Sequence, residues 1–189
     1  MVIKGRAPRE RKMGEDEIVV VNRALFRPRD WVVFLRVGGI LNTCTWDSVA
    51  DCYPIDRDKV NLLNGLLISA NAKVVLTDSM RYNIFNKMMD LHGIDYLLRM
   101  NGLQKDRIVG VVASDDEFPT GGERISAWRK AVGHIGAYVV IDHQYAGIVD
   151  DPHPSVIVDY TRGLTPENIT TARDLFQALM HDPTNHARP

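Results

Sequence analysis

Three side chains that can bind ions each stand directly after an apolar run of the sequence: Arg36, Thr77 and Asp142. A guanidinium and a hydroxyl donate hydrogen bonds to anions, whereas a carboxylate binds metal ions or pairs with a cation. The pattern predicts a ligand site for an anion, with Asp142 as a metal ligand only if a metal site is present. The candidates for binding the anion are the donors and glycines that follow the first two runs: Arg36, Gly38, Gly39, Asn42, Thr77, Ser79 and Arg81.

Most of these residues also have a structural explanation. Thr77 and Ser79 are common turn residues, Arg81 could cap a helix, and Asp142 could be a helix N-cap. Arg36 is harder to explain in this way, because a charge at the end of a buried strand needs a partner.

The apolar runs predict the strands of a parallel sheet. The run Trp31–Leu35 is continuous, as expected for a strand buried on both faces, and Gly38 and Gly39 end it. Ligands of such sheets bind at the carboxyl ends of the strands, so the residues that follow the runs are the place to look for function. The predicted strands are 18–21, 31–35, 72–76, 107–112, 137–141 and 155–159.

Apolar residues recur at helical spacing between these strands. Asp56 or Asp58 could cap the first helix, and Thr165 is a plausible N-cap of the last one, with Pro166 at its first position. Alternating strands and helices predict an α/β fold, a Rossmannoid three-layer sandwich with a mainly parallel sheet. The predicted helices are 58–69, 81–92 with Gly93 as the stop, 125–132 closed by Gly133, and the segment that begins at Thr165.

Composition indicates an ordinary globular chain. It has 189 residues, 45% of them hydrophobic, and a net charge of -1, which favours neither nucleic acid nor an anionic membrane. We expect a flexible basic arm at 1–16, a single domain at 17–180 and a tail at 181–189. No apolar run reaches the roughly 18 residues of a membrane span, and no secretory signal is recognised, so a cytoplasmic protein without a membrane partner is expected. The two cysteines and six histidines show no metal-site spacing.

The first long strand and its exit, Phe34–Thr43, resemble the opening motif of the haloacid dehalogenase (HAD) superfamily. That motif is an apolar strand followed by Asp-x-Asp-Gly and, in one branch, by an apolar pair and Asn. Arg36 stands at the first Asp position and Gly38 at the second, while Gly39 and Asn42 fit the motif. The branch is that of the HAD domains of Swiss-Army-knife RNA repair proteins.

Later stretches are similar to the other motifs of this family and follow in the same order, over residues 31 to 180. The second motif is an apolar strand that ends in Ser or Thr, which is Thr77 here. In this branch the strand continues to a Trp-Arg pair, of which Met80 replaces the Trp and Arg81 is kept. The fourth motif ends a strand with two acidic residues, of which Asp142 is kept and His143 is not acidic. The remaining similar stretches are Glu123–Trp128 and Asp159–Thr165.

The resemblance implies a phosphatase fold without its catalytic residues. In the family, the first Asp attacks a phosphoryl group, the second acts as acid and base, and Mg²⁺ binds between the first and fourth motifs. Arg36 cannot attack, because its guanidinium is always protonated, and Gly38 cannot move a proton. The leading hypothesis is a HAD-like pseudoenzyme with no catalytic residue and no cofactor. It would be a binding or regulatory module for a nucleotide, a nucleic-acid end or a protein ligand.

Two other functions remain open at this stage. A divergent Mg²⁺-dependent HAD phosphohydrolase could act on nucleotide or polynucleotide phosphates by recruiting Asp78, Asp115 or Asp142. A nucleic-acid-binding accessory protein could use the basic arm. For the pseudoenzyme, we predict that Arg36 lies within salt-bridge reach of Asp142 and takes the place of the magnesium, because a lone, partly buried carboxylate is unfavourable.

Overall fold

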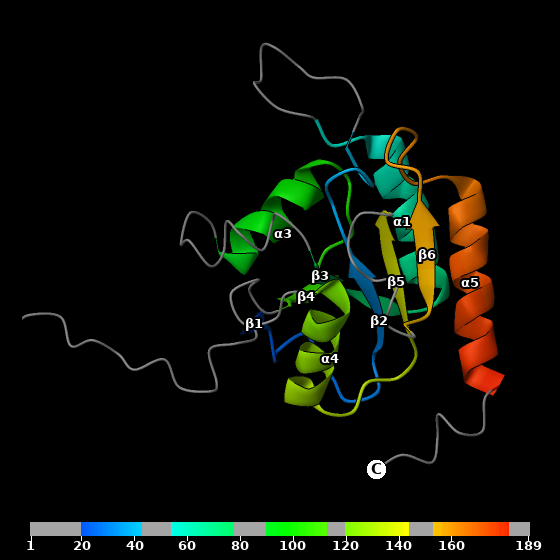
Figure 1. The fold of residues 1–189 in the computed structure, drawn as a ribbon. Coiled ribbons are helices and arrows are strands. Elements are labelled where there is room, and N and C mark those ends of the chain that lie inside the picture. The colour runs from blue at the N-terminus through cyan, green and yellow to red at the C-terminus, as the bar shows by residue number, and fades with distance from the viewer. Residues whose placement is uncertain (1–19, 43–53, 78–89, 113–119, 144–152, 182–189) are drawn as a thin grey trace, which may run out of the picture.

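One six-stranded sheet organises the chain (Figure 1). The computed structural model describes residues 20–42, 54–77, 90–112, 120–143 and 153–181. The strands are β1 (Val20–Val21), β2 (Trp31–Leu35), β3 (Ala72–Leu76), β4 (Ile108–Val111), β5 (Tyr138–His143) and β6 (Ser155–Val158).

The sheet is parallel except at one edge. Its strand order is β1-β4-β3-β2-β5-β6, and every neighbouring pair from β4 to β6 is parallel. Only the short β1 runs antiparallel, along β4. The five predicted parallel strands are confirmed to within two residues at their ends. Their continuous apolar runs were strong signals because both faces of these strands are covered.

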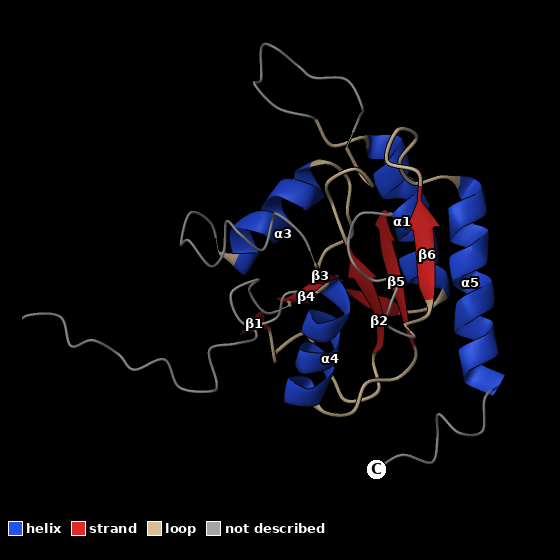
Figure 2. Cartoon of the chain, in the orientation of Figure 1, coloured by secondary structure: helices blue, strands red, loops and turns tan. Residues whose placement is uncertain are grey.

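Among the described residues, four helices cover the sheet (Figure 2). Side-chain caps fix where the first and the last of them begin. Asp56, not Asp58, caps the first helix and accepts a hydrogen bond from the amide of Asp58 at 2.9 Å. Thr165 caps the last helix as predicted, with its Oγ1 3.4 Å from the amide of Asn168. The helices are α1 (Arg57–Ser69), α3 (Leu91–Met100), α4 (Gly121–Val132) and α5 (Pro166–His181).

The prediction that Gly93 ends a helix is wrong. Gly93 lies in the first turn of α3, where its amide donates to the side chain of the N-cap Asp90 at 2.7 Å. Apolar spacing continues beyond the glycine to the buried Ile94 and Leu98, and this burial outweighs the low helix propensity of glycine. Of the predicted segment 81–92, residues 81–89 lie outside the described part of the chain, as does the arm at 1–16. His181, assigned to the tail, is the last residue of α5.

The two faces of the sheet carry different hydrophobic clusters. On β2, Val33 and Leu35 pack in the cluster that includes α1, α3 and α5. Val32 and Phe34 point to the opposite face, where they pack in the cluster of Trp128 on α4. Side chains alternate along a strand, so one continuous apolar run serves both layers. The protein is therefore an α/β three-layer sandwich with a mainly parallel sheet. No helix among the described residues is long and apolar enough to cross a membrane.

The strand order creates a switch point between β2 and β5. From β2 the chain moves outward through β3 to β4, and it then returns to the other side of β2 for β5 and β6. Connections therefore leave the carboxyl ends of β2 and β5 in opposite directions. In doubly wound sheets this divergence opens the crevice in which ligands bind.

Candidate anion-binding site

Arg36 and Asp142 meet at this switch point. The Nε atom of Arg36 lies 3.8 Å from Oδ1 of Asp142, so the predicted salt-bridge proximity is confirmed. The backbone brings the residues together, because the amide of Arg36 donates to the carbonyl of Ile141 at 3.1 Å and extends the β2–β5 ladder. Asp142 is buried, whereas 29% of the Arg36 side chain is exposed. The guanidinium thus connects a buried carboxylate with the surface.

Thr77 follows the neighbouring strand β3 and joins the same face. Phe34 and Val75 point toward α4, and Arg36 and Thr77 stand two residues further along their strands. The amide of Thr77 donates to a carbonyl of β2 at 3.0 Å, so the ladder is regular up to this residue. Asp142 follows the same alternation on β5. Three adjacent strands therefore direct their polar residues to one side of the carboxyl edge.

Two of these groups are buried donors that have no hydrogen-bond partner among the described residues. One is Oγ1 of Thr77, a residue that is only 6% exposed, and the other is Nε of Arg36. The separation of 3.8 Å from Asp142 is too long for a hydrogen bond. Leaving a buried donor unsatisfied costs about 1–3 kcal/mol, and native proteins rarely do so. Two such donors on neighbouring strand ends mark a place where an acceptor would be stabilised.

Asp142 differs from these donors because the backbone satisfies part of its carboxylate. Its Oδ1 accepts a hydrogen bond from the amide of His143 at 2.6 Å. The same oxygen lies 3.8 Å from Nε of Arg36. The carboxylate therefore has a hydrogen-bond donor and a positive charge beside it. Asp142 is therefore the counter-charge that holds Arg36 at the site.

The predicted glycines shape the loop that follows β2. Gly39 has a φ of +77°, and a Cβ at this position would lie 3.0 Å from Cδ2 of His143. Gly38 is half-buried in the same turn. Asn42 ends the loop, and its backbone carbonyl accepts a hydrogen bond from Lys59 Nζ at 2.9 Å, which joins the loop to α1. The loop is thus fixed at both ends beside the ion pair.

Part of the predicted site lies outside the described residues. This part comprises the donors Ser79 and Arg81 and the alternative carboxylates Asp78 and Asp115. The site that the structure brings together consists of Arg36, Thr77 and Asp142.

Arg124 of α4 is a further candidate whose importance the sequence did not reveal. It is 9% exposed, and it precedes Trp128 by one helical turn, about 6 Å along the axis. The Trp128 and Phe34 rings are in contact, with centroids 5.5 Å apart. Arg36 lies about 6.6 Å beyond Phe34, because a strand rises about 3.3 Å per residue. Since α4 runs back from the carboxyl edge, Arg124 lies nearer to that edge than Trp128 does, on the same face of the sheet as Phe34.

The described residues do not suit a magnesium ion. Mg²⁺ in proteins binds one or two carboxylates and keeps several waters or phosphate oxygens. Here the buried carboxylate at the strand ends, Asp142, already has a guanidinium at 3.8 Å, and that charge would repel a metal ion. Within the described ranges, no three His, Cys, Asp or Glu side chains are grouped as metal ligands would be.

A second polar cluster, between α4 and β5, is structural. The hydroxyl of Tyr138 accepts a hydrogen bond from Arg129 at 2.9 Å and lies 2.8 Å from Nδ1 of His153, to which it can donate its proton. Nε2 of His153 lies 3.2 Å from the carbonyl of Gly122 and 3.4 Å from Oγ of Ser126. A carbonyl only accepts, so Nε2 must carry the proton. His153 therefore ties α4 to the start of β5.

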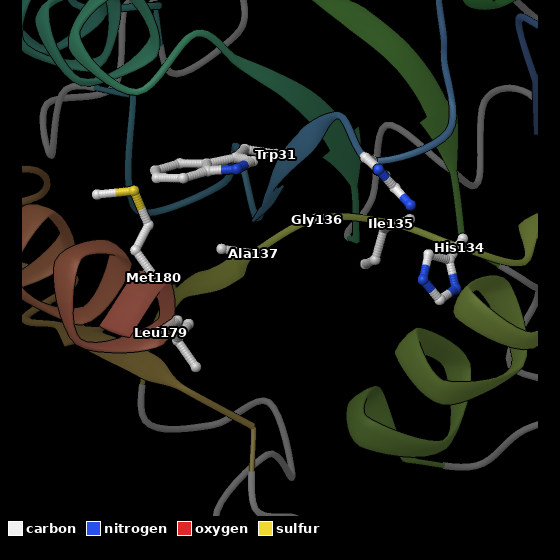
Figure 3. A pocket seen from close by; sticks show the side chains of 8 residues that line it. Trp31, His134, Ile135, Gly136, Ala137, Leu179 and Met180 are labelled. Atoms are coloured by element: carbon white, nitrogen blue, oxygen red, sulfur yellow. The ribbon is translucent and has the colours of Figure 1, made fainter. Parts of the chain in front are cut away.

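An open pocket of about 490 Å³ lies at the opposite, amino edge of the sheet. Figure 3 shows Trp31 at the start of β2, His134 and Gly136 in the segment before β5, and Leu179 and Met180 on α5. The helices end at this edge of the sheet. A positively charged side chain near a helix C-terminus stabilises the helix dipole, so charged residues at this edge do not imply a bound ligand. The size of the pocket alone is therefore not evidence for a binding function.

The fold and the strand-end residues together define a doubly wound α/β protein with an ion pair and unsatisfied donors at its switch point. Comparison with protein-family models, curated proteins and solved structures found no match to this chain. Its function must therefore be argued from these residues.

Proposed function

We propose that this chain is a pseudoenzyme of HAD-like phosphatase fold that binds a phosphate-bearing ligand at the carboxyl edge without hydrolysing it. The observation that carries the proposal is the pair of buried, unsatisfied donors on Arg36 and Thr77. An anion with several oxygen atoms can accept from both donors. Asp142 keeps the guanidinium in place.

The charge at the site supports an anion as the ligand. Arg36 offers a fixed positive charge that is partly exposed, and its planar guanidinium suits the paired oxygens of phosphate. Arg124, in the first turns of α4, is a second buried arginine on the α4 side of the sheet. The N-terminus of α4 contributes less, because Thr120 and Glu123 already form a capping box there. The anion would therefore be bound mainly by side chains.

The same residues argue against turnover. A covalent phosphatase needs a nucleophile where β2 ends, and Arg36 has no lone pair to attack with. Loss of the attacking group from a covalent mechanism lowers the rate by about 10⁴- to 10⁶-fold. We therefore expect no measurable hydrolysis of a generic phosphomonoester such as p-nitrophenyl phosphate in the presence of Mg²⁺.

Calorimetry with inorganic phosphate tests the binding half of the proposal. Arg36→Ala should weaken binding by about tenfold or more, because a hydrogen bond to a charged group is lost. Thr77→Val removes the hydroxyl but keeps the shape, and it should also weaken binding. Arg173→Ala is the matched control, because this exposed arginine lies on α5 and donates a hydrogen bond of 3.5 Å to the carbonyl of Gly65 on α1. Equal affinity in all four proteins would refute the site.

A hydrolysis assay of the wild-type protein and of Asp142→Ala tests whether the chain lacks turnover. Robust Mg²⁺-dependent turnover that disappears in Asp142→Ala would show that the chain is instead a divergent phosphohydrolase. The cytoplasmic location expected from the sequence is part of the same proposal, and cell fractionation tests it.

A further inference from the structure

Thr77, Arg36 and Asp142 form one row across the carboxyl edge of the sheet. The residues that precede them on β3, β2 and β5 are paired in register along both ladders. The amides of Thr77 and Arg36 continue these ladders with hydrogen bonds of 3.0 and 3.1 Å. Neighbouring strands lie about 4.8 Å apart, so Arg36 has a hydroxyl on one side and a carboxylate on the other.

The carboxylate of Asp142 stays close to any anion that Arg36 binds. Nε of Arg36 lies 3.8 Å from Oδ1 of Asp142. A ligand oxygen that accepts a hydrogen bond from this Nε at about 2.9 Å is therefore at most about 6.7 Å from Oδ1. Only 3% of the Asp142 side chain is exposed, so water screens its charge weakly. The ligand thus meets a fixed negative charge as well as the guanidinium.

These charges favour an anion with a single negative charge. The guanidinium of Arg36 and the carboxylate of Asp142 largely balance each other, and Thr77 is neutral. A second negative charge on the ligand is attracted by the guanidinium but repelled by the carboxylate. Over about 6.7 Å, repulsion by one unit charge weakens binding by about 3- to 60-fold, depending on how strongly water screens it. A dianion therefore gains little at this row over a monoanion.

The unsatisfied donors of the row support the same conclusion. A phosphodiester carries one negative charge and has two free oxygens on phosphorus, whereas a terminal monoester carries about two charges at pH 8 and has three. Among the described residues, the row has two buried donors without a hydrogen-bond partner, Nε of Arg36 and Oγ1 of Thr77. The two free oxygens of a diester can accept from both.

We infer that the ligand of this site carries a single negative charge at its phosphate, as a phosphodiester does. Asp142 is the residue that disfavours the dianion of a terminal monoester. The inference rests on the proposed anion site and names the class of phosphate that this site takes. Nucleic-acid backbones and phospholipid headgroups share this chemistry.

Calorimetry at pH 8 with methyl sulfate and methyl phosphate tests the inference. The two ions have nearly the same shape, but the sulfate carries one negative charge and the phosphate about two. Asp142→Asn keeps the shape of the side chain and removes its charge. It should therefore raise the affinity for methyl phosphate, relative to that for methyl sulfate, by about threefold or more. Because this ratio is compared between two proteins, the acceptor strengths of the ions and the charge of Arg124 cancel.

Two natural diesters distinguish the sources of the ligand. The dinucleotide thymidylyl-thymidine represents a nucleic-acid backbone, and glycerophosphocholine represents a lipid headgroup. At least one of them should bind the wild-type protein more tightly than the monoester glycerol 3-phosphate, and the tighter of the two names the source. If glycerol 3-phosphate binds more tightly than both, the inference is overturned.

Asp174→Asn is the matched control, because it removes a negative charge from an exposed position on α5 and should leave the ratio unchanged. The wild-type protein should also bind dimethyl phosphate more tightly than methyl phosphate at pH 8, a comparison that needs no variant. If methyl phosphate binds more tightly than dimethyl phosphate, or if folded Asp142→Asn keeps the wild-type ratio, the inference is overturned and the anion site stands. If no ion binds the folded wild-type protein, the anion site falls as well.

Discussion

The two edges of the sheet differ in how their polar groups are hydrogen bonded. At the amino edge, backbone groups satisfy one another: Arg29 donates to the carbonyl of His134 at 3.1 Å, and Gly136 donates to the carbonyl of Asp30 at 2.9 Å. At the carboxyl edge, Nε of Arg36 and Oγ1 of Thr77 are buried donors without a hydrogen-bond partner in the part of the chain that the structure describes. The pocket of about 490 Å³ nevertheless lies at the amino edge. The site that we propose at the carboxyl edge therefore rests on these donors and on the ion pair, and the volume of the pocket has no part in it.

Close packing at the amino edge explains why we assign it a structural role. A Cβ on Gly136 would lie 2.5 Å from the carbonyl oxygen of Arg29 and 2.6 Å from Cδ1 of Trp31. Trp31 is in turn stacked on Phe176 of α5, with centroids 5.1 Å apart. This edge joins three segments of the chain, and changes there should affect stability before they affect binding.

Gly136→Ala should give the largest effect on folding. The new methyl group would meet backbone and a packed ring, so we expect the free energy of unfolding to fall by about 2–3 kcal/mol in urea titrations. Gly65→Ala is the matched control. Its Cβ would lie 3.7 Å from Nη2 of Arg173, an ordinary contact, and alanine should stabilise α1 by up to about 1 kcal/mol. Equal stabilities for the two variants would contradict the assignment of the amino edge.

Arg36→Ala should have the next largest effect, at the other edge. It leaves the buried Asp142 without its counter-charge, and we expect a loss of about 1–2 kcal/mol, less than for a fully buried pair because Arg36 is partly exposed. Adding Asp142→Asn should recover part of this loss in a double-mutant cycle. If the single variant is as stable as wild type, the ion pair does not hold the strand ends together.

Thr77→Val should change stability in the opposite direction. Its hydroxyl is buried and unsatisfied among the described residues, so a methyl group of the same shape should stabilise the protein without ligand by up to about 1 kcal/mol. Thermal unfolding without phosphate measures this gain, and adding phosphate should favour the wild type. A lower melting temperature in the absence of ligand would mean that the hydroxyl has a structural partner.

The smallest effect concerns the turn that follows β6. The hydrogen bond from the Thr161 hydroxyl, followed by that from its amide, lowers the pKa of Asp159 below its usual value of 3.8. The ionised carboxylate of Asp159 therefore stabilises the turn above the usual pKa of 3.8. This stabilisation is lost as the pH falls through the lowered pKa of Asp159. Thr161→Val should raise the pKa of Asp159 toward 3.8, which carboxyl NMR titration would detect. An unchanged titration would mean that the hydroxyl does not restrain the turn.

Sequence reasoning succeeded where a signal was continuous and local. The strands followed from their apolar runs, and the cap at Thr165 followed from residue type and position. For the first helix the sequence left Asp56 and Asp58 open, and the structure decides for Asp56. The start of α3 was missed because Gly93 suggested a stop, while the tertiary burial of Ile94 and Leu98 decides the matter. Local glycine signals are weak evidence when apolar spacing continues past them.

The site was predictable only in part, for the same reason. The proximity of Arg36 and Asp142 followed from a resemblance that implies neighbouring strands. Arg124 was underrated, because its burial depends on how α4 crosses the sheet. The pocket could not be foreseen, since segments far apart in the sequence line it.

The antiparallel direction of β1 has a practical consequence for attaching the protein to a surface. Val20 pairs with Val111 near the carboxyl end of β4, so the chain enters the sheet at the edge of the proposed site. The helix α5 runs back and ends beside the pocket at the amino edge, which Leu179 and Met180 help to line. A tag placed after α5 would therefore orient the protein with its anion site facing the solution. A label at the start of β1 would instead lie at the same carboxyl edge of the sheet as the proposed site.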